Sequence, residues 1–266
     1  MVPMAPAEAE VLTGLMLGDG SLPLGERARN AHLSVTRAAR DLEYQLWTAG
    51  VFADRLTPRG VVVRDVHDAR TGRTYQSAVL RTRSEPAFTE ARRRWYPNGK
   101  KQVPAALTLT APVVAVWLAD DGSVTAASRR CPDIKLATHG FSVAEVEHLA
   151  GLLSRRYAGP VGVYCESESQ RTLRLIGAPA RALLRDVDPV FPPLERKSQR
   201  WRNTELLADK EPTPVCPRCG FGEVYRWAKT PRGVQKFKCQ RCMRVFRSEY
   251  ERPGRDPKRQ MAVKSG

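Results

Sequence analysis

The sequence has no apolar run approaching the roughly 20 residues that a membrane-spanning helix needs, which excludes an integral membrane protein. Its first ten residues contain two acids and no basic residue, which argues against a secretory signal. We therefore expect a soluble, intracellular protein, in the cytoplasm or an organelle. Only four of the 266 residues are histidine, and their spacing matches no histidine-based metal motif.

Acidic residues are also scarce relative to basic ones. The chain has 28 Asp and Glu against 44 Lys and Arg, a formal net charge of +16, and 34 of the basic residues are arginine. A charge of this size indicates a polyanionic partner, and the arginine fork suits phosphates and guanine edges. Hydrophobic residues at 42% are sufficient for a packed core, so wholesale disorder is excluded.

The composition changes near residue 207, where a polar stretch containing two prolines begins. Residues 208–266 contain 15 basic and 6 acidic residues, so the short C-terminal part is the more densely basic one. We expect a large domain over 1–207, a small domain over 208–250 and a basic, disordered tail over 251–266.

The large domain has the pattern of a tandem repeat, with halves at about 7–100 and 108–200. Helices are expected at 7–18, 40–54 and 86–95 in the first half and at 111–120, 143–157 and 180–187 in the second. Strands are expected at 31–37, 61–67, 74–83, 123–128, 134–139, 161–165 and 171–176. The sequence therefore predicts an α+β fold, a pseudo-two-fold tandem repeat of αββαββα in one chain, which we expect to be a monomer.

The first helix of each half ends in the same way, on Asp19-Gly20 and on Asp121-Gly122. Small residues recur four apart in both helices, at Gly14 and Gly18 and at Ala115 and Ala119, and this spacing places them on one helix face. If the two helices pack through these faces, Asp19 and Asp121 meet at the C-terminal ends.

Two carboxylates at helix C-termini repel each other and the helix dipoles, and a divalent cation would remove both costs. Oxygen-only ligation suits Mg²⁺, and such ions can activate water for phosphodiester cleavage. The alternative is that each Asp-Gly pair simply forms a turn. One copy would favour the turn, whereas two matched copies favour the metal site.

These segments resemble the two LAGLIDADG motifs of a single-chain homing endonuclease. The second motif, Val114 to Gly122, matches one branch of that family because it ends in the tryptophan-containing stretch Trp117 to Ser123. The resemblance covers roughly residues 8–200. It implies that Asp19 and Asp121 bind the catalytic Mg²⁺ ions with help from the backbone carbonyls of Gly18 and Asp120. It also implies double-strand DNA cleavage with staggered 3′ overhangs, and a role in mobilising an intron or a similar element.

The resemblance further places a catalytic lysine near each scissile phosphate. Lys101 matches one such position, in Lys100-Lys101-Gln102-Val103-Pro104. Lys197 matches the other, in Pro193-Leu194-Glu195-Arg196-Lys197. The sequence departs from the family pattern at Arg196, where an aromatic residue is usual.

Basic side chains on the predicted strands are candidate DNA contacts, because a β-surface can enter the major groove. The candidates in the large domain are Arg64, Arg73, Arg81, Arg83, Lys135, His139 and Arg171. The alternative for each is a charge on a solvated strand face.

The C-terminal part contains two CxxC pairs, Cys216 with Cys219 and Cys239 with Cys242. This spacing resembles a zinc ribbon with a structural, four-thiolate Zn²⁺ site, although two disulfides or an iron centre are alternatives. Trp227, Lys236 and Lys238 would add DNA contacts from its hairpin.

The function predicted from the sequence is a site-specific, Mg²⁺-dependent DNA endonuclease acting on double-stranded DNA. The alternative is a non-cleaving protein on the same fold, either a group I intron maturase that binds intron RNA or a DNA-binding regulator.

Overall fold

The computed structural model describes residues 3–128, 131–167, 170–208, 214–220 and 223–247. The chain divides into two compact units, Met1–Ala208 and Asp209–Gly266. The basic tail expected at 251–266 lies outside the described residues. In the part of the chain that is described, no helix is both long enough and apolar enough to cross a bilayer.

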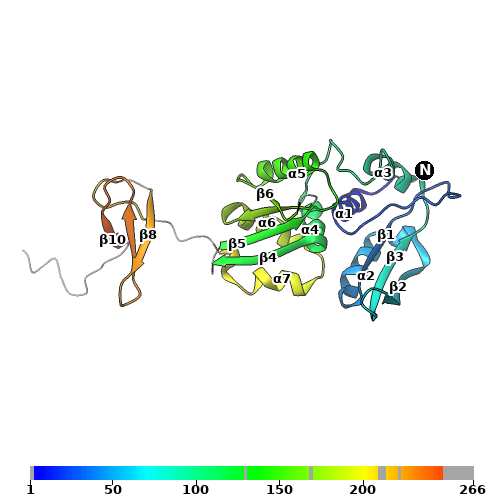
Figure 1. Cartoon of the computed structure of the whole chain (residues 1–266), viewed down its shortest axis with the longest axis horizontal. Coiled ribbons are helices and arrows are strands. Elements are labelled where there is room, and N and C mark those ends of the chain that lie inside the picture. The colour runs from blue at the N-terminus through cyan, green and yellow to red at the C-terminus, as the bar shows by residue number, and fades with distance from the viewer. Residues whose placement is uncertain (1–2, 129–130, 168–169, 209–213, 221–222, 248–266) are drawn as a thin grey trace, which may run out of the picture. The chain divides into compact units, whose positions relative to one another are not determined.

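The first repeat places three strands in an antiparallel sheet of order β1-β3-β2 (Figure 1). Its elements are α1 (Pro6–Leu17), β1 (Ser34–Ala38), α2 (Leu42–Val51), β2 (Leu56–Asp68), β3 (Arg73–Thr82) and α3 (Pro86–Trp95). Instead of another strand before β1, Ser21 pairs with Ser34 in an isolated bridge. The αββαββα pattern is therefore present with one strand of the first repeat reduced to a bridge.

The second repeat has a complete four-stranded antiparallel sheet of order β4-β5-β7-β6. Its elements are α4 (Ala111–Asp121), β4 (Gly122–Ser128), β5 (Cys131–Ala137), α5 (Val143–Arg156), β6 (Gly162–Cys165), β7 (Arg171–Ile176) and α6 (Ala178–Val187). Ser142 begins α5 with a capping box, because its hydroxyl accepts the Glu145 amide at 3.4 Å and Glu145 accepts the Ser142 amide at 2.7 Å. A further helix, α7 (Glu195–Arg202), follows, which the sequence did not predict.

Helices α1 and α4 lie side by side between the two sheets (Figure 1). Residues 11–17 of α1, apart from Thr13, and residues 113–119 of α4 are apolar and buried, so these parts of the two helices are enclosed by protein. Leu15 and Met16 of α1 and Trp117 of α4 are fully buried in the core that both repeats share. The C-terminal ends of these two helices are consequently fixed relative to each other by this shared core.

The C-terminal unit contains a three-stranded antiparallel sheet of order β10-β9-β8. Its strands are β8 (Val224–Lys229), β9 (Gln235–Cys239) and β10 (Val245–Arg247). The core of this unit is small and consists of Val224, Phe237 and the cysteines, with Phe246 packed against them. A domain of this size usually needs a metal or disulfides to fold.

Candidate active site and thiol cluster

The contact between α1 and α4 depends on the glycines of α1. A Cβ atom added to Gly14 would lie 2.6 Å from Val116 Cβ and 2.7 Å from the carbonyl oxygen of Val113. A Cβ added to Gly18 would lie 2.5 Å from Asp120 Cβ. The predicted helix pairing is observed, but the glycines of α1 face larger residues of α4, and Ala119 packs with Tyr44 instead.

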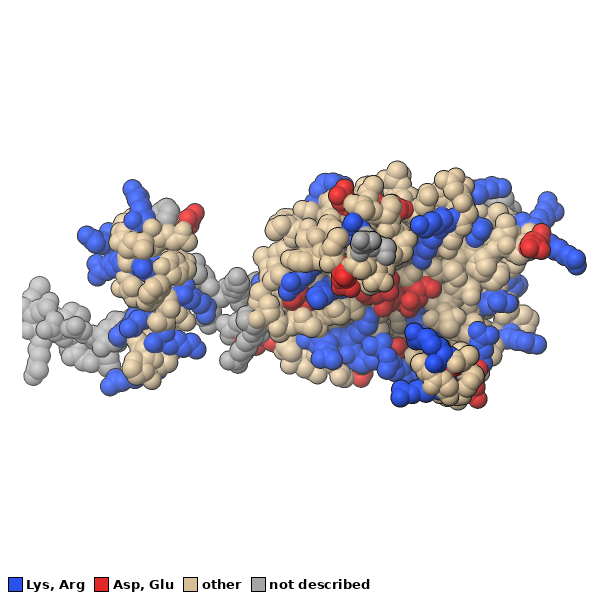
Figure 2. Space-filling view, in the orientation of Figure 1, with Lys and Arg blue, Asp and Glu red and all other residues tan. Residues whose placement is uncertain are grey.

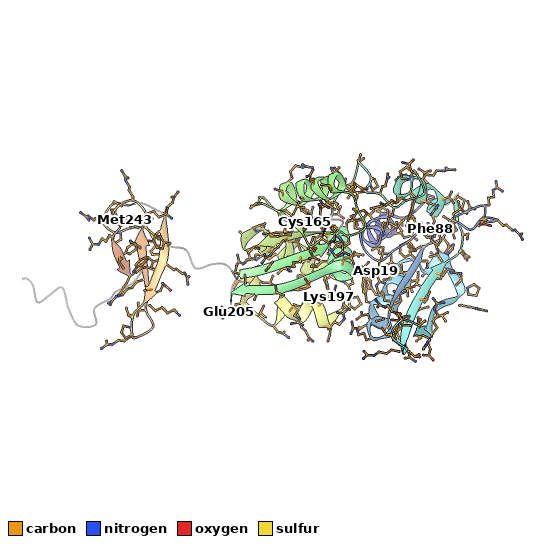
Figure 3. The ribbon with its side chains drawn as sticks, in the orientation of Figure 1. Asp19, Phe88, Cys165, Lys197, Glu205 and Met243 are labelled. Atoms are coloured by element: carbon orange, nitrogen blue, oxygen red, sulfur yellow. The ribbon has the colours of Figure 1, made fainter. Side chains whose placement is uncertain are left out.

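Asp19 and Asp121 lie at the C-terminal ends of the paired helices, where Figure 3 labels Asp19. Burial raises the pKa of Asp121 to about 7, with repulsion from Asp19 and Asp120 adding to the effect. The pKa of Asp19 is also raised, first because the surrounding protein displaces water and then because Asp120 repels its charge. Figure 2 shows acidic side chains gathered at the centre of this face with basic side chains around them. The carboxylates are thus close enough to repel one another, and a bound cation would offset that repulsion.

Asp120 immediately precedes Asp121, but its side chain is 0% exposed and both of its carboxylate oxygens accept hydrogen bonds within the protein. Its Oδ1 accepts hydrogen bonds from Arg37 Nη2 at 2.8 Å and from the Tyr44 hydroxyl at 2.9 Å. Its Oδ2 accepts the backbone N–H of Asp19 at 3.2 Å. The side chain of Asp120 therefore holds the end of α1 in place, and Asp121 presents the more accessible carboxylate of the second motif.

Arg37, on β1, extends this network into the first repeat. Its side chain is 4% exposed and donates to Thr48 Oγ1 at 3.2 Å and to Gln45 Oε1. Its guanidinium lies 3.8 Å from the centre of the Tyr44 ring. Burial alone would lower the pKa of Arg37, but the charge of Asp120 and the hydrogen bond to its carboxylate raise this pKa. This network was not predicted from the sequence. The signal that could have indicated it is Asp120 itself, because an acid on a buried helix needs a hydrogen-bonding or charged partner.

Each motif end is contacted by one of the predicted lysines. Lys101 Nζ donates to the carbonyl oxygens of Gly18 and Gly20, both at 2.9 Å. Lys197 Nζ, on α7, donates to the carbonyls of Ala119 at 2.6 Å, Gly122 at 2.8 Å and Asp120 at 3.0 Å (Figure 3). Burial lowers the pKa of both lysines. The two ammonium groups occupy matching places in the two repeats.

Arg196 holds α7 in place, although an arginine at this position departs from the family pattern. Its guanidinium forms a two-pronged ion pair with Asp41, with Nε–Oδ1 at 2.6 Å and Nη2–Oδ2 at 2.7 Å. This hydrogen bonding to Arg196 lowers the pKa of Asp41. Because Asp41 immediately precedes α2, the pair ties the helix that bears Lys197 to the first repeat.

The predicted DNA contacts of the large unit are divided between two sheets. Arg64, Arg73 and Arg81 are exposed on one face of the first sheet, because Arg64 pairs with Ser77 and alternate residues of β3 share a face. Arg83 lies beyond β3 and contacts the Asp54 carbonyl and Glu85.

In the second sheet, Lys135 is exposed on β5 between the fully buried Ile134 and Leu136. His139 lies beyond the end of β5 and contacts Glu166 at 3.3 Å. Arg171 shares its face with Leu173, which is buried, so Arg171 and Lys135 lie on opposite faces.

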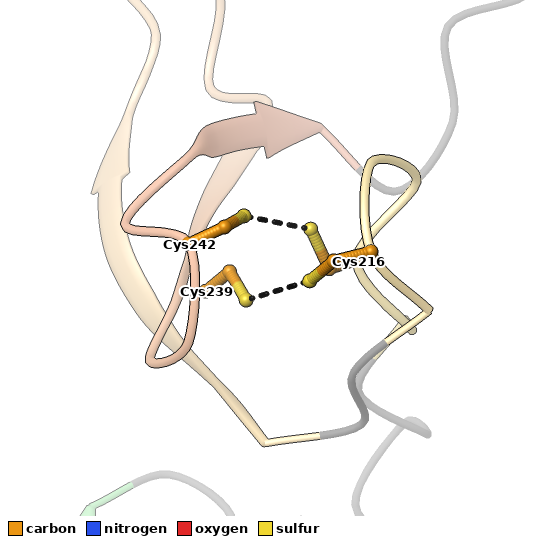
Figure 4. A group of neighbouring side chains, drawn as sticks. Cys216, Cys239 and Cys242 are labelled. Atoms are coloured by element: carbon orange, nitrogen blue, oxygen red, sulfur yellow. Dashed lines mark hydrogen bonds between the residues drawn. The ribbon is translucent and has the colours of Figure 1, made fainter.

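The four cysteines of the CxxC pairs converge in the C-terminal unit (Figure 4). Their sulfurs all lie within 4.8 Å of one another, with Cys216–Cys242 at 3.5 Å and Cys219–Cys239 at 3.6 Å. These separations are far longer than the ~2.05 Å of a disulfide, and the thiols are free. Burial opposes ionisation of Cys216, but hydrogen bonds from the Arg218 and Cys219 amides and from neighbouring thiols lower its pKa. The cluster can hold one metal ion.

A family model described as the LAGLIDADG DNA endonuclease family matches residues 9–174. The chain belongs to this family. The match confirms the predicted family, and the observed elements confirm the predicted α+β fold.

A solved LAGLIDADG structure, described as the homing endonuclease I-WcaI bound to its DNA recognition sequence, has the same fold. It is 20% identical to this chain with a TM-score of 0.65, over 74% of this chain and 88% of the other.

Two curated relatives match parts of this LAGLIDADG chain. An uncharacterized protein of Methanocaldococcus jannaschii is 32% identical over 46% of this chain and 48% of its own length. A cytochrome b mRNA maturase of Debaryomyces hansenii is 24% identical over 58% of each chain. The chain thus spans about half the length of the curated relatives that it matches.

Proposed function

We propose that this chain is a site-specific, metal-dependent endonuclease that cuts both strands of a DNA duplex and leaves staggered ends. The observation that carries the proposal is the meeting of Asp19 and Asp121 at the ends of two packed helices, where mutual repulsion contributes to the raised pKa of Asp121. A site built to attract a divalent cation has this electrostatic character.

The residues at the site fit Mg²⁺, because all the available donors are oxygens. Asp19 and Asp121 would hold the ions, together with the carbonyl oxygens of Gly18 and Asp120. Each of those carbonyls accepts a lysine hydrogen bond and keeps a second lone pair. When bound, such ions supply an activated water and stabilise the leaving oxygen.

The remaining roles belong to the chain's own side chains. Lys101 and Lys197 would offset the negative charge that develops on each scissile phosphate, since one ammonium group lies beside each motif end. The arginines on the open face of the first sheet, with Lys135 on the second, would contact phosphates and base edges.

The C-terminal unit is proposed to be a zinc ribbon that adds nucleic-acid contacts. A tetrahedral site with Zn–S bonds of ~2.3 Å places sulfurs ~3.8 Å apart, close to the 3.5 and 3.6 Å separations of the thiol pairs. Four thiolates complete the coordination shell, so this ion would be structural. Its role is to fold the small unit.

The test is cleavage of complex, intron-free genomic DNA by the zinc-loaded full chain, with and without Mg²⁺, followed by sequencing of the ends. We expect discrete staggered breaks from the wild type and none from Asp19→Asn or Asp121→Asn, both of which should still bind DNA. Asp65→Asn, at an exposed acid of β2, is the matched control and should cut normally. Cleavage by either motif variant at the wild-type rate would contradict the assignment.

The similarity to a maturase provides the second candidate, an RNA-binding protein that assists splicing. The two proposals differ in their requirement for Asp19 and Asp121. Binding to a folded group I intron RNA that survives both Asn substitutions, with no DNA cleavage by the wild type, would favour the maturase.

A further inference from the structure

The sheet of the C-terminal unit has two unlike faces. Phe237 pairs with Phe246 across β9 and β10, and both pack with Val224 and the thiol cluster. The next row along the sheet, Tyr225, Lys238 and Val245, points to the opposite face because side chains alternate along a strand. One face is therefore the core of the unit and the other meets solvent.

Two aromatic rings project from the solvent face. Trp227 is 53% exposed and Tyr225 is 37% exposed, and their ring centres lie 5.9 Å apart in an edge-to-face arrangement. The ladder between β8 and β9 shifts between Arg226 and Ala228, so Trp227 sits at a bulge, a feature that often re-aims a side chain. Lys238 Nζ lies 4.3 Å from the centre of the Trp227 ring, which keeps a cation beside it.

The surroundings of these rings are strongly basic. Residues 214–247 include nine Lys or Arg and a single acid, Glu223. Lys236 and Arg247 form the row next to Lys238 on the solvent face. Figure 2 shows Lys and Arg side chains at several places around this unit. Exposed aromatic rings among cations suit a ligand that has both flat rings and negative charges.

We propose that this face, defined by Tyr225, Trp227, Lys236 and Lys238, binds unpaired nucleotides of single-stranded nucleic acid by stacking bases on the two rings. The bases of a duplex are stacked on one another, so a ring on a flat sheet can reach a base face only where the strand is unpaired. Lys236 and Lys238 contact the phosphates between the stacked bases. The proposal rests on the nucleic-acid-binding role proposed for this unit and is independent of cleavage.

The test measures binding of the zinc-loaded full chain to three fluorescein-labelled probes, dT12, rU12 and a 12-base-pair duplex. Binding is measured by fluorescence anisotropy at a fixed salt concentration. We expect Trp227→Ala to weaken dT12 or rU12 binding by roughly 5- to 150-fold, the loss of one stacked base, and to change duplex binding far less. Trp227→Phe should recover part of the affinity because it restores a ring. The ratio of dT12 to rU12 affinity identifies DNA or RNA as the source of the strand.

The matched control is Leu46→Ala, which removes an exposed apolar side chain from α2 in the other unit, away from the sheet faces, and should leave binding unchanged. Zinc content of one ion per chain confirms that Trp227→Ala is folded. Wild-type affinity of Trp227→Ala for both single strands, with tight duplex binding, would overturn this inference and leave the duplex binding proposed for the chain intact. Failure of the wild type to bind any of the probes would contradict both.

Discussion

Replacement of Asp120 by Asn should destabilise the large unit more than any other single change of an acid to its amide at the site. The side chains of Arg37 and Asp120 are 4% and 0% exposed and are 2.8 Å apart, so the substitution leaves a buried guanidinium without its counter-charge. Removing one partner of a buried ion pair costs about 3–5 kcal/mol. A domain of this size shifts its melting temperature by roughly 2–4 °C per kcal/mol, so we expect a loss on the order of 10 °C.

The assay is guanidinium unfolding of the large unit, monitored by circular dichroism, and the free energy of unfolding of Asp120→Asn is compared with that of two other variants. Tyr44→Phe removes one hydrogen bond to the same carboxylate and should cost about 1.5–3 kcal/mol. Glu90→Gln, in the exposed i,i+4 pair with Arg94, is the matched control and should cost under about 0.5 kcal/mol.

A cost for Asp120→Asn within 1 kcal/mol of the control would refute the reasoning. It would mean that the buried Arg37 guanidinium does not need the charge of Asp120, so that the Asp120 carboxylate could bind another group. Asp120 would then compete with Asp121 as the cation ligand of the second motif.

Three other predictions follow from the site and the thiol cluster. Because the folded-state pKa of Asp121 is raised to about 7, the folded state binds its proton more tightly. Without Mg²⁺, this carboxyl group should therefore lower the free energy of unfolding by at most about 4 kcal/mol as pH rises from about 4 to about 7, and Asp121→Asn should remove that contribution from the denaturation curves. Gly14→Ala should cost about 1–3 kcal/mol because its Cβ would meet Val116, whereas Gly50→Ala, with no atom nearby, should stabilise α2 by up to about 1 kcal/mol. Removing the zinc ion that we propose, or substituting Cys216→Ser, should unfold only the C-terminal unit, seen as a fluorescence change from Trp227 with the melting of the large unit unchanged.

Much of the fold could be predicted because its signals are local. Apolar periodicity and turn residues located the helices α1 to α6 within a few residues, and the matched Asp-Gly ends indicated the repeat. The thiol cluster was also predictable, because CxxC spacing brings two ligands together within one turn.

Helix α7 could not be predicted from its own residues. Its sequence, Glu195–Arg202, is almost entirely polar and has no apolar stripe. The helix is held by partners outside itself: Trp201 is buried edge-on against Phe191, with ring centres 4.9 Å apart, and Arg196 pairs with Asp41, 155 positions away in the sequence. Contacts over such separations carry no local signal, so the structure was needed to show how Lys197 reaches the second motif.

The contacts of Asp120 could not be predicted from the sequence either, because its partners are also far away along the chain. These contacts show that the two motifs are not equivalent. The position in α1 that corresponds to Asp120 is Gly18, where a Cβ would lie 2.5 Å from that of Asp120. One side chain fills the space between the helix ends, so only one motif can supply it. Asp120 takes that place and accepts the amide of Asp19, so the second motif positions the acid of the first. The repeat can therefore offer two acids for cations but only one acid that joins its halves.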